Sequence, residues 1–159
     1  MRPVLLIPIT DDEYHTWLAQ SVKDYAQDKV DAGTWQPEEA LSRSENDFTS
    51  LLSQGRTTPD NHIYSIQDAT LGTHVGVLWI AVTSRGLHRS AFIYDIVIYE
   101  AYRRQGYGEG TMLALEDKVR DLGLDTVGLH VFGHNKAALT LYEKVGYVVT
   151  DINMSKTLR

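Results

Sequence analysis

A glycine-rich stretch between a strand pattern and a helix pattern constrains this chain more than any other feature. Gly106, Gly108 and Gly110 occupy alternate positions directly after Arg103 and Arg104. Residues without a Cβ let a bulky anion approach the unpaired amides of a helix N-terminus closely. The stretch therefore predicts an amide nest for phosphate or pyrophosphate, to which the two arginines add positive charge. A tight turn with solvated arginines is the alternative interpretation.

Hydrophobic periodicity predicts that strands and helices alternate along the rest of the chain. Thr10 and Glu13 form a capping box before an amphipathic helix that Gly33 ends, and Pro37 begins a second helix that ends near Gly55. The other expected elements are strands over 3–8, 63–67, 75–83 and 91–99, a helix over 108–123, a strand over 126–132, a helix over 135–145, and one or two strands over 147–158. This order predicts an α/β fold of the α+β mixed type, in which helices flank a mixed sheet.

Composition narrows the classes of protein that fit. The 159 residues are 43% hydrophobic, which predicts a single domain over residues 1–159. The net charge of −6 disfavours a nucleic-acid partner, and the absence of Cys excludes thiolate metal sites and suits a reducing cytoplasm. No signal peptide is visible, and the longest apolar run, 75–82, is far shorter than the roughly 20 residues of a membrane span. We expect a cytoplasmic protein without a membrane partner.

Two familiar phosphate-binding motifs do not fit the glycine stretch. A Walker loop needs Lys followed by Ser or Thr after its last glycine, and the stretch has neither. A dinucleotide fingerprint needs Gly where Thr111 stands and an acidic residue after the next strand, whereas Asp125 precedes that strand.

The segment from 94 to 147 instead resembles the GNAT superfamily of acetyl-CoA-dependent N-acetyltransferases. Its cofactor signature of Arg or Gln, two variable residues, Gly, one variable residue, and Gly or Ala is matched by residues 103–108. A second signature follows in the expected order. Its residues here are Asn135, Leu141, Tyr142, Gly146 and Tyr147.

The resemblance implies a mixed sheet of six to seven strands with about four helices, splayed between the fourth and fifth strands. It implies that amides from Arg104 through Glu109 hold the pyrophosphate of acetyl-CoA, and that the strand at 96–98 pairs with the pantetheine arm. Asn135 would contact that arm, and Tyr142 would protonate the departing thiolate. The residues that the resemblance assigns to the cofactor are Ile96, Val97, Ile98, Arg103, Arg104, Gln105, Gly106, Tyr107, Gly108, Glu109, Asn135 and Tyr142.

Alternatives remain for the second signature. Tyr142 could be a core aromatic residue on a helix face, and Asn135 could be a helix cap.

The proton acceptor for the amine is the least defined group. Many family members carry Glu where this chain has Tyr94. Asp95 follows, but strand alternation predicts that it faces away from Tyr94, so it is either a base or a hydrogen-bonded structural carboxylate. Tyr94 would then shape the acceptor pocket or relay a proton through water. His130 and His134 lack a zinc-site setting, and we expect no metal.

By analogy with the family, the acceptor should enter over residues 25–39. There Trp35, Glu38 and Glu39 could line an aromatic and acidic pocket for an ammonium group, or form a packed Trp and a solvated helix start. The expected function is transfer of an acetyl group from acetyl-CoA to a small-molecule or peptide primary amine by direct attack in a ternary complex.

Two other functions compete with this one. A non-catalytic acetyl-CoA-binding sensor or interaction module has the same fold, and a nucleotide-phosphate binder would use the same glycine stretch. A homodimer is left open as an assembly state.

Overall fold

A computed structural model describes all 159 residues, which form two compact units, Met1–Leu129 and His130–Arg159. The first unit contains the whole sheet and three α-helices, and the second contains one helix. The expectation of a single domain over residues 1–159 stays a prediction.

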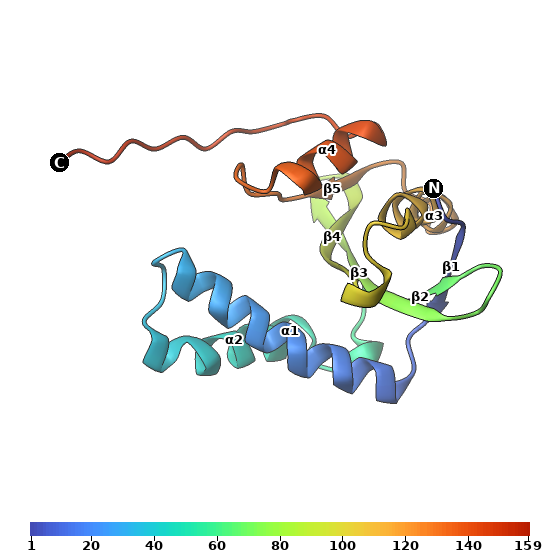
Figure 1. Cartoon of the computed structure of the whole chain (residues 1–159), viewed down its shortest axis with the longest axis horizontal. Helices are drawn as coiled ribbons and strands as arrows, with labels where there is room; N and C mark the ends of the chain where they lie inside the picture. Colours follow the sequence, from blue (N-terminus) through green and yellow to red (C-terminus); the bar gives the residue numbers. More distant parts are fainter. The chain divides into compact units, whose positions relative to one another are not determined.

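The first unit is built on one five-stranded sheet in the order β1-β2-β3-β4-β5 (Figure 1). The first four strands pair antiparallel and β5 pairs parallel with β4, so the sheet is mixed as expected. The β3 and β4 strands are joined by a tight turn at Gly86, whose φ of 61° suits a residue without a Cβ. The strands are β1 Val4–Pro8, β2 Asn61–Asp68, β3 His74–Arg85, β4 His88–Ile98 and β5 Val127–Leu129.

The helices begin and end where local sequence signals place them. Thr10 and Glu13 form the expected capping box of α1, and Pro37 stands in the first turn of α2. Gly106 adopts a left-handed conformation as the N-cap of α3. The helices are α1 Asp11–Asp31, α2 Pro37–Leu51, α3 Tyr107–Asp121 and α4 Lys136–Lys144, with short 3-10 turns η1 Gly55–Thr57 and η2 Glu100–Tyr102.

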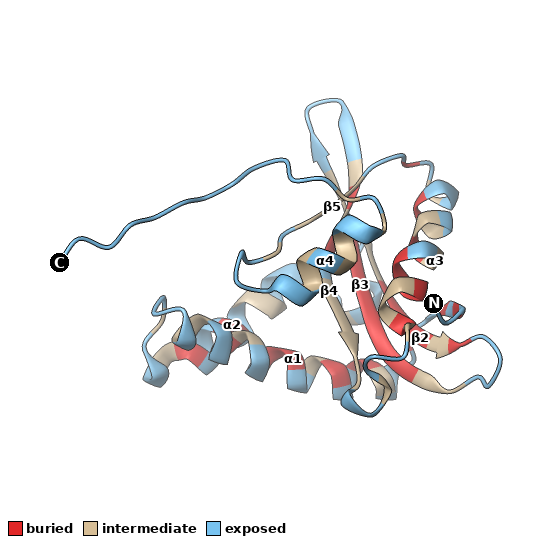
Figure 2. Ribbon diagram, turned by 45° about the horizontal axis from the view of Figure 1, so that its top comes forward, coloured by how far each residue is buried: buried red, intermediate tan, exposed pale blue.

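Both faces of β3 are covered, which explains its nearly continuous apolar sequence. Trp79 and Val77 face α1 in a cluster of buried side chains, and Figure 2 shows buried residues along β3 and on one side of α1. The alternate residues Leu78 and Ile80 are fully buried on the opposite face. Tyr64 of β2 pairs with Leu78 and lies on the same face. The ammonium of Lys118 from α3 lies over the Tyr64 ring.

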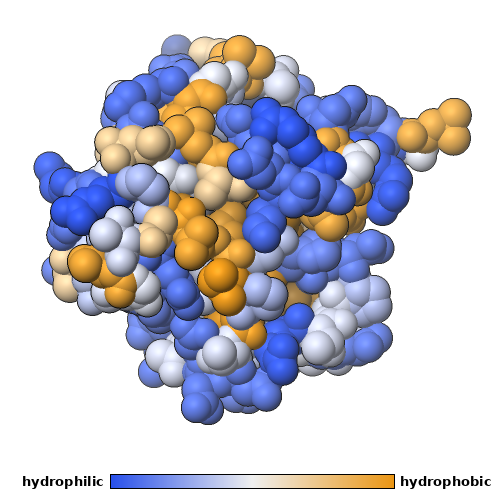
Figure 3. All heavy atoms as spheres, turned by 90° about the vertical axis from the view of Figure 1, so that its right-hand side faces the viewer, coloured by the Kyte–Doolittle hydropathy of each residue, from blue (hydrophilic) through white to orange (hydrophobic).

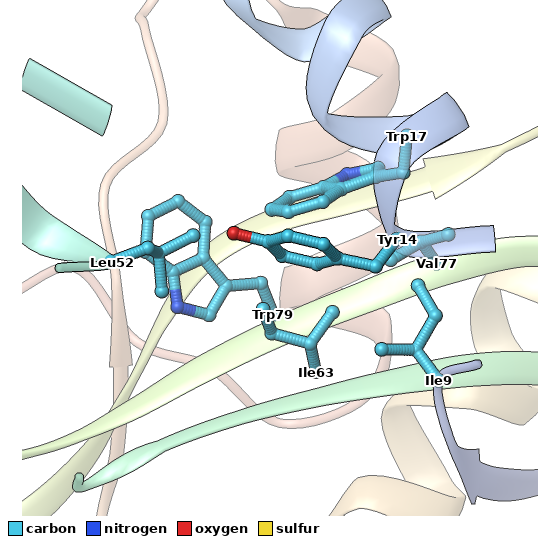
Figure 4. Packing of buried hydrophobic residues seen from close by; sticks show 7 residues of the cluster. All are labelled: Ile9, Tyr14, Trp17, Leu52, Ile63, Val77 and Trp79. Carbon is cyan, nitrogen blue, oxygen red and sulfur yellow. The ribbon is translucent and has the colours of Figure 1, made fainter. Parts of the chain in front are cut away.

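Aromatic residues from α1 and β3 form the centre of the buried cluster between this helix and the sheet. In Figure 4 the rings of Tyr14 and Trp17 from α1 lie beside Trp79 of β3. Trp17 and Trp79 meet edge to face with their ring centroids 5.6 Å apart, a favourable arrangement for aromatic pairs. This packing fixes α1 over the middle of the sheet.

The sheet has five strands, fewer than the six to seven that we expected. The pattern over 126–132 forms strand only at Val127–Leu129, and residues 147–158 form none. Apolar residues such as Val148 and Ile152 are exposed there. Alternating apolar residues favour a strand only where a neighbouring strand supplies hydrogen bonds, and this segment pairs with no strand in the structure.

Apolar side chains also reach the surface of the first unit. Leu5 and Ile7 of β1 and Leu71 are exposed, and Figure 3 shows one face of the molecule on which apolar atoms gather between hydrophilic ones. Because β1 is an edge strand, its free side has no hydrogen-bonding neighbour.

Candidate functional site

A β-bulge at Tyr94 is the feature around which the candidate site is built. Asp95 pairs with Trp79, but the next β3 residue, Ile80, pairs with Ile93, so Tyr94 is an extra residue in β4. A bulge of this kind bends a strand and redirects side chains.

The bulge overturns the expectation that Tyr94 and Asp95 face opposite sides of the sheet. The ring of Tyr94 stacks on Trp79 with centroids 4.7 Å apart. Asp95 accepts a hydrogen bond of 3.0 Å from the indole N–H of Trp17, whose ring also packs on Trp79. Both side chains therefore lie on the face covered by α1, because the extra residue breaks the two-residue alternation.

Beyond the bulge, β4 has a neighbour on one side only. The β5 strand pairs with Ala91 to Ile93 and with no later residue. Ile96, Val97 and Ile98 pair with β3 but not with β5, which is the splay expected between the fourth and fifth strands. An added extended segment could use such an edge for main-chain hydrogen bonds.

The loop after β4, where the sequence predicts an anion nest, contains two residues in the left-handed backbone region. Arg104 and Gly106 have positive φ angles of 59° and 89°, and α3 begins at the next residue. Positive φ is uncommon for a residue other than glycine, and it is found more often at functional sites. The first amides of α3 have no acceptor within the helix, so the loop and the helix start suit a diphosphate.

Gly110 does not belong to this nest, which corrects the sequence interpretation. Its amide already donates to the Gly106 carbonyl over 3.2 Å. A Cβ at Gly110 would lie 1.8 Å from the carbonyl oxygen of Arg2, so the missing side chain allows the chain just before β1 to touch α3. Gly110 is therefore a packing residue.

Side chains around the loop hold it in place. Tyr107 is buried, and its hydroxyl donates a 2.6 Å hydrogen bond to Asp68, so only its backbone can meet a cofactor. The Arg103 guanidinium donates to the Ile98 carbonyl over 2.8 Å, and Gln105 donates to Ala101 over 3.1 Å. The loop is thus tied both to the end of β4 and to β2.

A cavity of about 370 Å³ lies beside the bulge. It is open to solvent, and Tyr94 forms part of its wall. Four of its lining residues are aromatic and one carries a carboxylate. The lining residues are Tyr25, Asp47, Phe48, Ser50, Leu51, Trp79 and Tyr94.

Of the two interpretations of Trp35, Glu38 and Glu39, the pocket for an ammonium group is not formed. The cationic groups of Lys29 and Arg43 already lie over the Trp35 ring, at 5.6 and 5.8 Å from its centroid. Glu39 pairs with Arg43 over 3.4 Å and caps α2. The alternative reading, a packed Trp beside a charged helix start, is correct because the protein's own cations occupy this aromatic face.

The environment of Asp95 changes its acidity. Burial raises the pKa of the Asp95 carboxyl above its usual range, although hydrogen bonds from Trp17 and Ser21 oppose the shift. A carboxyl with a raised pKa is better matched to accept a proton near neutral pH. Asp95 is also hydrogen-bonded to α1, so both interpretations of this residue are physically compatible.

The second unit carries the other two candidate residues. Asn135 caps α4 by accepting a 3.2 Å hydrogen bond from the Ala138 amide. Tyr142 lies within α4, and its ring contacts that of Tyr147 with centroids 5.9 Å apart. Gly146 follows the helix with φ of 101°. The capping alternative for Asn135 is therefore confirmed, whereas contacts of either residue with a cofactor stay predictions.

Three residues of the cavity wall, Phe48, Trp79 and Asp47, were missed in the sequence. Trp79 was part of an apolar strand and Phe48 of an apolar helix side, and both indicated only core packing. Asp47 gave no signal, because one carboxylate on an amphipathic helix is typical of a solvated face.

No group of three or more His, Cys, Asp or Glu side chains is arranged to hold a metal ion. No helix has the length and apolar composition to cross a membrane.

Comparison with known proteins shows what the whole chain is similar to. Residues 15–147 match the model of the acetyltransferase (GNAT) family. The chain is 41% identical to YycN of Bacillus subtilis, described as an uncharacterised N-acetyltransferase, over 98% of this chain and 99% of that protein. It is 33% identical to a second such protein, YdgE, over 94% of this chain and 95% of the other.

Solved structures give the same result. The crystal structure of YycN superposes with a TM-score of 0.89 at 40% identity, over 98% of this chain and 99% of that one. An acetyl transferase structure from Pyrococcus furiosus has a TM-score of 0.64 at 21% identity, over 98% and 99% of the two chains, which shows a shared fold alone.

Proposed function

The chain belongs to the acetyltransferase (GNAT) family, and we propose that it moves an acetyl group from acetyl-CoA to a primary amine by direct attack in a ternary complex. The observation that carries the proposal is the stretch of β4 that follows the bulge and has no β5 partner, Ile96 to Ile98. It leads through one short loop into the amide nest at the start of α3.

The residues of this region fit the chemistry of acetyl-CoA. Amides from Arg104 to Glu109 would hold its pyrophosphate, with charge support from Arg103 and Arg104. Ile96, Val97 and Ile98 would pair with the amide groups of the pantetheine arm as an added strand does. Asn135 would contact that arm.

The amine would approach from the cavity. Tyr94 lines the cavity and also stands at the point where β4 parts from β5, so an amine bound there lies beside the expected thioester. Because the enzyme would hold both reactants in one complex, the reaction between them becomes effectively unimolecular. Tyr94 would then shape the acceptor pocket, one of the two roles expected for it from the sequence.

Two groups would move protons. As the amine nitrogen forms its bond to the acetyl carbon and the C–S bond breaks, Tyr142 would donate a proton to the thiolate; a phenol and a thiolate of similar basicity, with pKa about 10, are well matched. Asp95 would accept the proton that the amine loses. Because Asp95 does not line the cavity, that proton would travel through water.

Release of free CoA tests the proposal. The protein is incubated with acetyl-CoA and a panel of amines, and thiol is followed over time. Tyr142→Phe should lower kcat with little change in acetyl-CoA affinity, while Tyr64→Phe, a buried phenol outside the cavity, should leave kcat unchanged. Tight acetyl-CoA binding without turnover on any amine would favour the non-catalytic module, and full activity of Tyr142→Phe across pH would remove its role as the acid.

A further inference from the structure

The wall of the cavity beside Tyr94 is mostly aromatic. Tyr25, Phe48, Trp79 and Tyr94 follow one another along it, with successive ring centroids 5.9, 5.8 and 4.7 Å apart. These contacts fix the rings against each other. The indole N–H of Trp79 donates to Asn61 over 2.8 Å, so it needs no partner from a ligand. The wall thus offers a ligand mainly apolar ring surface.

A single carboxylate, that of Asp47, interrupts this apolar wall. Asp47 is half-buried, and no Lys or Arg forms an ion pair with it. Arg43 pairs with Glu39, and Lys29 lies over the rings of Trp35 and Tyr25, at 5.6 and 5.5 Å from their centroids, without pairing with Asp47. A partly buried carboxylate that has no cationic partner favours binding of a positively charged ligand.

The size of the cavity limits the ligand. About 370 Å³ lies near the lower end of the range for small-molecule sites, roughly 300 to 1,000 Å³. A polyamine or an aminoglycoside carries several ammonium groups, and this wall could neutralise only one of them. The remaining ammonium groups would find no second carboxylate in this wall.

From this lining we infer that the acceptor is a small primary amine with one positive charge on an apolar, preferably aromatic, body. The body packs against Trp79 and Tyr94, and Asp47 recognises the ammonium group by charge, with the ring faces adding cation–π attraction. The bound ammonium gives one proton to water before its nitrogen attacks the thioester, and Asp95 accepts the second proton as the amide forms. The inference rests on the proposed transfer reaction, since it names the substrate class for the same site.

Calorimetry and thiol release together test the inference with phenethylamine and spermidine as probes. Phenethylamine should bind more tightly and have the larger kcat/KM. Asp47→Asn should weaken phenethylamine binding and raise its KM by about tenfold or more, because it removes a charge-assisted contact. Acetyl-CoA affinity should not change. Glu45→Gln, an exposed carboxylate of α2 outside this cavity, is the matched control and should have no effect.

A comparison of two ligands on wild-type protein tests the same inference without relying on the folding of a variant. The neutral alcohol 2-phenylethanol should bind wild-type protein about tenfold or more weakly than phenethylamine, because only the amine carries charge. Equal binding of the two, preference for spermidine, or an unchanged phenethylamine KM in Asp47→Asn would each overturn the inference.

The two proposals fail in distinguishable ways. Thiol release with spermidine but not with phenethylamine would contradict the substrate class and leave the transferase intact. Binding of phenethylamine that depends on Asp47, with no thiol release from any amine, would support the pocket's specificity and contradict the transferase.

Discussion

Substitution of Gly110 tests whether this glycine serves packing or anion binding. An ideal Cβ at Gly110 would lie 1.8 Å from the Arg2 carbonyl oxygen, and an ordinary contact needs about 3.4 Å. In Gly110→Ala, α3 and the chain before β1 must therefore separate by about 1.6 Å (3.4 − 1.8). Because the atom encountered belongs to the backbone, it cannot rotate away as a flexible side chain would.

The expected cost follows from two opposing effects. Overpacking at a rigid site costs up to about 3 kcal/mol. The higher helix propensity of alanine than of glycine stabilises the folded state by at most about 1 kcal/mol. The free energy of unfolding should therefore fall by about 2 kcal/mol, which lowers Tm by roughly 4 to 8 °C in a chain of this size.

Urea denaturation of wild type and variant measures this difference. Gly133→Ala is the matched control, since a Cβ there meets nothing within 4 Å and its φ is not positive; its stability should stay within about 0.5 kcal/mol of wild type. If Gly110→Ala kept wild-type stability but lost acetyl-CoA affinity, Gly110 would belong to the anion nest after all and the packing argument would be wrong.

Two further predictions concern ionisable groups. Burial holds the pKa of Asp95 above its unfolded value, so the stability linked to this group is full below the unfolded pKa and is lost as pH rises through the folded one. Asp95→Asn cannot ionise, so its free energy of unfolding in urea should rise relative to that of wild type as pH increases from 4 to 7. Its kcat should be lower than that of wild type. A stability difference that does not depend on pH would contradict the assignment. At the start of α3, the hydrogen bond from Tyr107 lowers the pKa of Asp68. The contribution of Asp68 to the stability of the folded protein is therefore present above its unfolded pKa and is lost as pH falls through the folded one. Tyr107→Phe should be more destabilising at pH 7 than at pH 3 and should weaken acetyl-CoA binding without changing the KM of the amine; equal destabilisation at both pH values would show that the bond to Asp68 is not the cause.

The sequence predicted the elements whose signals are local. The capping box of Thr10 and Glu13, Pro37 in the first turn of α2, and the glycine loop before α3 each act within a few residues, and the structure confirms all three. The order of strands and helices followed from periodicity for the same reason.

Features that depend on distant partners could not be predicted. The role of Gly110 depends on Arg2, and the bulge at Tyr94 appears only in the register of β4 against β3. The sequence could not decide between a ligand pocket and a packed side chain at Trp35, because nothing in the local sequence shows that Lys29 and Arg43 lie over its ring. Tertiary contacts decide what such a side chain faces.

Amide hydrogen exchange with and without acetyl-CoA tests the central claim most directly, because it reports where on the backbone the cofactor acts. We expect slower exchange at Ile96 to Ile98 and at residues 104–109 when acetyl-CoA is added, with little change in β1 and β2. Unchanged exchange in both segments under saturating acetyl-CoA would contradict the claim that the free edge of β4 and the start of α3 bind this thioester.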